Sequence, residues 1–358
     1  MDKKKVLLLG LALIILAGAT VFLYFSRPQP PLETKFSQNS REEISQNSSY
    51  ALLNSPRHVY QTFNNCGPAT LSMILSWYGT NVSQKELADA MRPYQNPTGD
   101  DDDKTIFTSE FADWAQKYGY QALSRVNGDI ELLKRFTANG IPVVVKTWLR
   151  VGEDIGHFRI VRGFDEEKRV IIQDDSYHGP DKRISYFDFL SLWQPFNYAY
   201  IIVYTPAMEE KVVAIVGEEW DESLSWKNAL ARAEKEKQLD GENVYPEFNI
   251  STAAYHLGDY QKSVQAFAEV EARLPRRMLW YQIEPILAYQ KLKNYQRVFE
   301  ITDRLLNGGN RAFSELYIIR GEILLTQGEK EKAKVEFEKA VLYNKNLEKA
   351  KQALEMLK

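Results

Sequence analysis

Four polar residues in the first half of the chain are of types that together can break an amide bond. Cys66, the single cysteine among 358 residues, lies where an Asn-rich loop meets an apolar helical pattern. Gln61 precedes it, His157 opens a strand-like stretch, and Asp174 ends the following one. A thiol attacks a carbonyl carbon when an imidazole takes its proton and a carboxylate orients that imidazole. The four residues therefore predict a cysteine nucleophile.

The residues that follow Cys66 predict a helix that would activate the thiol. Apolar residues recur at helical spacing over 66–78. Pro68 is favoured in a first helical turn, because its missing N–H is not needed there. The positive end of a helix dipole stabilises a thiolate and lowers the thiol pKa below about 8.5. The Cys66 backbone N–H and the Gln61 side-chain amide could then hold a developing oxyanion.

Around these residues, helical patterns come first and strand patterns follow. Helices are predicted over 66–78, 83–91, 108–120 and 129–140, and strands over 141–149, 157–165, 169–175 and 198–206. This order indicates an α+β domain with an antiparallel sheet, spanning 50–206. Two adjacent antiparallel strands could place Asp174 beside His157, and Asp175 is the alternative carboxylate.

The C-terminal part of the chain, 242–358, reads as helix throughout and repeats. Turn-forming pairs recur every 35 residues, at Gly258-Asp259, Lys293-Asn294 and Gly328-Glu329. The pattern resembles tetratricopeptide repeats, and a plain helical bundle is the alternative. The range 346–357 predicts a capping helix, which stacked repeats need. A charged connector with some helix, 207–241, joins the two parts.

The N-terminus predicts a membrane segment over 1–27. Three lysines at 3–5 precede an uncharged, mostly apolar run, 6–25, and about 20 such residues cross a bilayer. The lysines favour a cytoplasmic N-terminus, which would leave the bulk of this single-pass protein extracytoplasmic. A cleaved signal peptide is the alternative. The polar range 28–49, rich in Pro, Ser, Asn and Gln, predicts a flexible linker.

Composition excludes several other classes of protein. The net charge of −3 and the pI near 6.0 show no basic bias, so no nucleic-acid partner is expected. One cysteine cannot form an intrachain disulfide, and no Cys/His cluster has zinc-ligand spacing. We therefore expect neither a metal nor another cofactor.

Four stretches resemble the peptidase C39-like family, a papain-like group of cysteine peptidases: QTFNNCGPATLSMILSWYG, NGIPVVVKTW, GHFRIVRGFD and RVIIQDDS. The resemblance covers the first domain and implies a papain-like fold there. It implies Cys66 as nucleophile, His157 as general base, Asp174 as orienting carboxylate and Gln61 as oxyanion donor. Its best-known members cleave leader peptides after a double glycine and are fused to ATP-driven exporters. This chain has no Walker A motif and no polytopic membrane domain.

The sequence therefore predicts a membrane-anchored, extracytoplasmic cysteine peptidase that hydrolyses a peptide or amide bond. The helical repeats would bind a protein partner in their concave groove. Two alternatives stay open: an inactive scaffold that keeps the fold, and an acyl transferase that uses the same residues.

Overall fold

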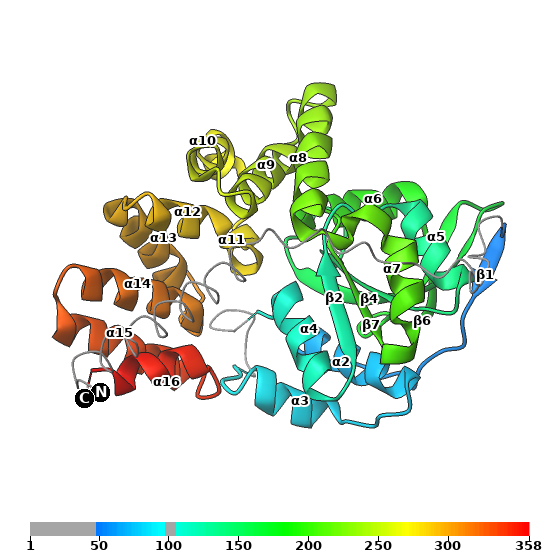
Figure 1. Ribbon diagram of the computed structural model, residues 1–358, viewed down its shortest axis with the longest axis horizontal. Helices are drawn as coiled ribbons and strands as arrows, with labels where there is room; N and C mark the ends of the chain where they lie inside the picture. Colours follow the sequence, from blue (N-terminus) through cyan, green and yellow to red (C-terminus); the bar gives the residue numbers. More distant parts are fainter. Residues whose placement is uncertain (1–47, 97–104, 358) are drawn as a thin grey trace, which may run out of the picture. The chain divides into compact units, whose positions relative to one another are not determined.

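The computed structural model describes residues 48–96 and 105–357 (Figure 1). The predicted membrane segment, 1–27, and most of the predicted linker, 28–49, lie outside these residues. Among the residues described, no helix combines the length and the apolar character needed to cross a membrane. All of these residues belong to one compact unit, 44–358.

A seven-stranded sheet organises the first half of the described chain, and all its pairings are antiparallel. The strands are β1 (Tyr50–Leu52), β2 (Gln121–Arg125), β3 (Val143–Trp148), β4 (Gly156–Asp165), β5 (Val170–Asp175), β6 (Gly179–Ser185) and β7 (Tyr200–Tyr204). Their order is β2-β7-β3-β4-β5-β6, and β1 pairs with β4. The predicted antiparallel sheet is confirmed. Strands β1, β2 and β6 were not predicted, because short strands with exposed polar residues carry little apolar pattern.

Helices cover both faces of this sheet. They are α2 (Cys66–Trp77), α3 (Gln84–Met91), α4 (Thr108–Lys117), α5 (Ile130–Ala138), α6 (Tyr186–Trp193) and α7 (Glu209–Val216). Alternate residues of β3 show why: Val144 packs with α2 and α4, whereas Val143 and Val145 pack with α5 and α6. A strand buried on both faces reads as a mainly apolar run, as 141–149 does apart from Lys146 and Thr147.

The remaining described residues are helical. The helices are α8 (Glu222–Leu239), α9 (Val244–His256), α10 (Tyr260–Val270), α11 (Met278–Tyr281), α12 (Glu284–Lys291), α13 (Tyr295–Asn307), α14 (Ser314–Thr326), α15 (Lys330–Tyr343) and α16 (Glu348–Glu355). The turns within the helix pairs fall where the repeat predicts them, with positive φ at Gly258, Lys293 and Gly328. The predicted connector is mostly helix, and α8 packs along α9.

Gly321 shows how tightly one helix pair closes. A Cβ added at Gly321 of α14 would lie 2.5 Å from Cε1 of Phe337 on α15. Because Phe337 is fully buried, its ring has little room to move. We expect Gly321→Ala to lower the free energy of unfolding by about 1–3 kcal/mol, measured by urea denaturation. The exposed control Glu338→Ala should change it by less than about 0.5 kcal/mol. Equal values for the two variants would contradict close packing between α14 and α15 at this position.

Candidate active site

The thiol of Cys66 lies at the first residue of α2, as predicted. Asn64 takes a left-handed conformation, with φ of +54°, and turns the chain into the helix. Asn65 is buried, and its side-chain oxygen accepts a hydrogen bond from Arg92 Nη1 at 3.2 Å. The next nine residues of α2, 67–75, are all buried. The helix is thus fixed in the core, while Cys66 itself stays partly exposed.

His157 stands next to Cys66, at the start of β4. The Cys66 Sγ lies 3.9 Å from the carbonyl oxygen of Gly156, the residue before His157. Burial alone would raise the pKa of the Cys66 thiol. A hydrogen bond with His157 and the positive charges of His157 and Lys146 outweigh burial and lower that pKa to about 6. The chain therefore holds a thiol that ionises below neutral pH.

A buried carboxylate orients the imidazole. His157 Nε2 donates to Asp175 Oδ1 at 2.8 Å, and both side chains are about 2% exposed. This bond leaves Nδ1 as the ring nitrogen for the thiol. Burial disfavours the charged imidazole, but the adjacent Asp175 carboxylate outweighs burial, so the pKa of His157 rises above its usual 6.5. The arrangement favours a thiolate beside an imidazolium.

The predicted carboxylate, Asp174, is not the one that bonds to His157; the structure places Asp175, the alternative, against the imidazole. In the ladder between β4 and β5, Asp175 lies opposite Arg159 and Asp174 lies opposite Ile160. Because side chains alternate along a strand, Asp175 shares a face with His157 and Asp174 points to the other face. There Asp174 pairs with Arg162 at 2.9 Å. A difference of one residue therefore decides which carboxylate orients the imidazole.

Asp175 is held by more donors than His157 alone. Its Oδ2 accepts from Arg159 Nε and from His178 Nδ1, each at 3.0 Å. Its Oδ1 accepts from the backbone N–H groups of Tyr177 at 2.8 Å and His178 at 3.0 Å. These contacts fix the carboxylate in place. Although burial alone would raise the pKa of Asp175, the charge on His157 and these hydrogen bonds hold that pKa well below its ordinary value. Neither His178 nor Arg159 is among the site residues predicted from the sequence, although strand alternation places Arg159 on the His157 face.

Gln61 is anchored to the strand end that carries Asp175. Its backbone N–H donates to the carbonyl oxygen of Ser176 at 2.8 Å. Its side-chain Oε1 accepts from Ser176 Oγ, also at 2.8 Å. Because these bonds engage Oε1, the Nε2 amide is the end of the side chain available to donate to an oxyanion. The structure thus brings Gln61 to the loop before α2 and beside β5.

Residues 43–201 match the Peptidase_C39 like family. The resemblance read from the sequence is therefore confirmed over this range, which we call the C39-like domain. It contains Cys66, His157 and Asp175, together with Gln61. None of the curated proteins matches the chain.

Solved structures similar to the chain include two peptidases and one other protein. A C39-like peptidase from Bacillus anthracis is 16% identical, and the match covers 44% of this chain and 98% of that one, with a TM-score of 0.39. The peptidase domain of Streptococcus ComA, a bi-functional ABC transporter involved in quorum sensing, is 22% identical, with coverages of 41% and 96% and a TM-score of 0.32. MamA from Desulfovibrio magneticus RS-1 is 20% identical, with coverages of 37% and 74% and a TM-score of 0.34.

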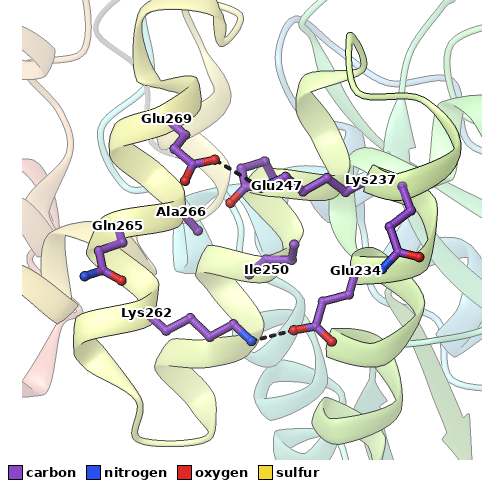
Figure 2. A pocket seen from close by; sticks show the side chains of 9 residues that line it. Glu234, Lys237, Glu247, Ile250, Lys262, Gln265, Ala266 and Glu269 are labelled. Atoms are coloured by element: carbon purple, nitrogen blue, oxygen red, sulfur yellow. Dashed lines mark hydrogen bonds and ion pairs between the residues drawn. The ribbon is translucent and has the colours of Figure 1, made fainter.

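A cavity of about 550 Å³ lies away from these residues, among α8, α9 and α10 (Figure 2). Its charged side chains pair with one another: Lys237 with Glu247 and Glu269, and Lys262 with Glu234. These ion pairs link the three helices, and we assign them that structural role. Within residues 48–96 and 105–357, no group of three or more His, Cys, Asp or Glu side chains is placed to hold a metal ion.

Proposed function

We propose that the C39-like domain hydrolyses peptide or amide bonds through a thioester on Cys66. The observation that carries the proposal is the contiguous set Cys66, His157 and Asp175, in which the thiol pKa falls to about 6. A buried thiol without such partners would have a raised pKa, since burial disfavours its anion. A lowered pKa is typical of cysteines that act as nucleophiles.

In the proposed reaction each of these groups has a defined role. The Cys66 sulfur attacks the carbonyl carbon, forming an S–C bond, while His157 holds the thiol proton. The backbone N–H of Cys66 and Nε2 of Gln61 stabilise the oxyanion. His157 then gives its proton to the leaving amine as the C–N bond breaks. Water, deprotonated by His157, hydrolyses the thioester and restores the thiol.

The lowered pKa of Cys66 and the raised pKa of His157 together predict a bell-shaped dependence of kcat/KM on pH. The acid limb should fall near pH 6, where Cys66 loses its proton. The alkaline limb should fall above pH 6.5, where His157, whose pKa is raised, loses its own. The measurement is kcat/KM between pH 4 and 10 on a peptide that the protein cleaves. A rate that rises steadily through pH 9 would show an ordinary thiol without an imidazolium partner.

The test of hydrolysis itself needs no knowledge of the natural substrate. A library of peptides from a digested bacterial proteome is incubated with the wild-type protein, and new termini are identified by mass spectrometry. We expect cleavage by the wild type and none by Cys66→Ala. Equal products from both would end the proposal. Glycinamide added as an amine acceptor would show acyl transfer as new amide products rather than free carboxylates, and absence of any reaction would favour a scaffold.

We further propose, from the N-terminal sequence, that the chain is anchored in a membrane with the C39-like domain outside the cytoplasm. Its substrate would then be an extracytoplasmic peptide or protein, and the helical repeats would bind a protein partner. Protease added to intact cells should degrade the C39-like domain if this topology holds. Degradation only after lysis would contradict it.

A further inference from the structure

Lys146 is a buried cation beside the active site that the proposed reaction does not use. It lies on β3, 4% exposed, and its ladder partner is Phe158, the residue after His157. Its Nζ lies 4.0 Å from the ring centroid of Phe158, 5.0 Å from that of Tyr281 and 6.0 Å from that of Phe196. These three rings, which we call the aromatic enclosure, present π faces to the ammonium.

One wall of the enclosure comes from the helical part of the chain. Tyr281 ends α11, and its hydroxyl forms a hydrogen bond with the backbone of Gly156. Its ring lies 5.5 Å from Trp148 and 5.9 Å from Phe196, measured between centroids. A Cβ at Gly156 would lie 2.6 Å from Cε1 of Tyr281, so only glycine leaves room for this ring.

An ion pair fixes the same segment to the turn before His157. Arg277, just before α11, pairs with Asp154 at 2.7 Å through Nη1, and its backbone N–H donates to the same carboxylate at 3.0 Å. Both side chains are largely buried. The contact between α11 and the β3–β4 turn is therefore built from packing, backbone bonding and charge together.

We propose that the helical repeats complete the active site: Tyr281 closes the aromatic enclosure and thereby positions the Lys146 ammonium to stabilise the Cys66 thiolate. This inference rests on the proposed function, in which Cys66 is the nucleophile. The contact between Tyr281 and Gly156 supports this inference, because the carbonyl oxygen of Gly156 also lies 3.9 Å from the Cys66 sulfur. Tyr281 acts here as a positioning residue and does not itself take part in the reaction.

The energetic reason is that a buried ammonium needs a fixed environment. Water would otherwise solvate Lys146 and screen its charge from the thiolate. The aromatic faces attract the cation and hold it in place, where its positive charge favours the Cys66 thiolate. The other ionisable groups around the thiol are His157 and Arg159 on β4, Arg92 after α3 and Tyr281 itself.

A double-mutant cycle tests the proposal through the single thiol. The rate of Cys66 alkylation by iodoacetamide is measured against pH in the full-length protein. Lys146→Met and Tyr281→Leu should each raise the midpoint by about one pH unit. The double variant should show no more than the Lys146→Met shift, because Tyr281 acts through Lys146. Tyr281→Phe, which restores the ring, should recover most of the low midpoint.

Controls separate the possible failures. Tyr255→Leu, in α9 of the repeats, removes a partly buried ring that contacts the rings of His256 and Tyr260 rather than those of the enclosure, and it should leave the midpoint in place. A wild-type midpoint near that of an ordinary thiol would refute the proposed nucleophile itself. A low wild-type midpoint that Tyr281→Leu and Lys146→Met both leave unchanged would refute only the role of the enclosure. Should Tyr281→Leu fail to fold, the Lys146→Met result alone decides, since an unchanged midpoint there removes the premise.

Discussion

Asp175→Asn is expected to slow peptide hydrolysis by about 10²–10⁴-fold. Both carboxylate oxygens of Asp175 accept from donors: Oδ1 from His157 and two backbone N–H groups, and Oδ2 from Arg159 and His178. An asparagine at this position must turn its NH₂ group toward one of these two groups of donors. The NH₂ group would then face other donors and could not accept their hydrogen bonds. The substitution also removes the charge that raises the pKa of His157. The imidazole would lose both its orientation and its preference for the proton.

The neighbouring carboxylate supplies the matched control for this experiment. Asp174→Asn makes the same chemical change one residue away, on the opposite face of β5. The folded fraction of the Asp174→Asn variant should keep the wild-type rate and the wild-type pH profile. Hydrolysis is measured on a peptide cleaved by the wild type, with circular dichroism to normalise for folded protein. A larger loss of rate in Asp174→Asn than in Asp175→Asn would reverse the assignment made here.

The second large effect concerns stability and belongs to Asp174. Its carboxylate pairs with Arg162, which is 1% exposed, and accepts from the backbone N–H of Asp181 at 3.0 Å. Asp174→Ala leaves a buried guanidinium without its buried partner, and such changes cost about 3–5 kcal/mol. We expect a loss of about 3 kcal/mol in the free energy of unfolding, because the exposed Asp181 still pairs with Arg162.

Urea denaturation at neutral pH measures this loss. The control is Asp188→Ala, an exposed carboxylate in the first turn of α6, which should cost about 1 kcal/mol or less. A cost for Asp174→Ala no greater than that of the control would mean that the Asp174–Arg162 pair contributes little. We therefore expect the two adjacent aspartates to differ in their effects: Asp175 on catalysis and Asp174 on folding.

The order of elements and the start of α2 could be predicted because they depend on local pattern. Helical spacing after Cys66, a proline in the first turn and β-branched strands are properties of neighbouring residues. The pairing of His157 with a carboxylate on the next strand was also within reach. The sequence could not show which carboxylate pairs with His157, because the β4–β5 register decides this and a shift of one residue exchanges the two faces.

The contribution of the helical part could not have been predicted from local pattern. Tyr281 contacts Gly156 and Lys146, which lie far from it in the sequence. In the sequence it is one of 20 tyrosines, placed at the end of a four-residue helix. Lys146 likewise interrupts an apolar strand, and no local sequence pattern marks it. Contacts between distant segments have no periodic signal, so such residues are found only in the structure.

The most direct test of the account is the alkylation rate of Cys66 against pH in the wild type and in His157→Ala. The single cysteine gives a signal that belongs to one residue. We predict a wild-type midpoint near pH 6 and, in His157→Ala, a midpoint moved toward that of an ordinary thiol, about 8.5. Two superimposable profiles near 8.5 would contradict an activated Cys66–His157 pair, and with it the proposed peptidase.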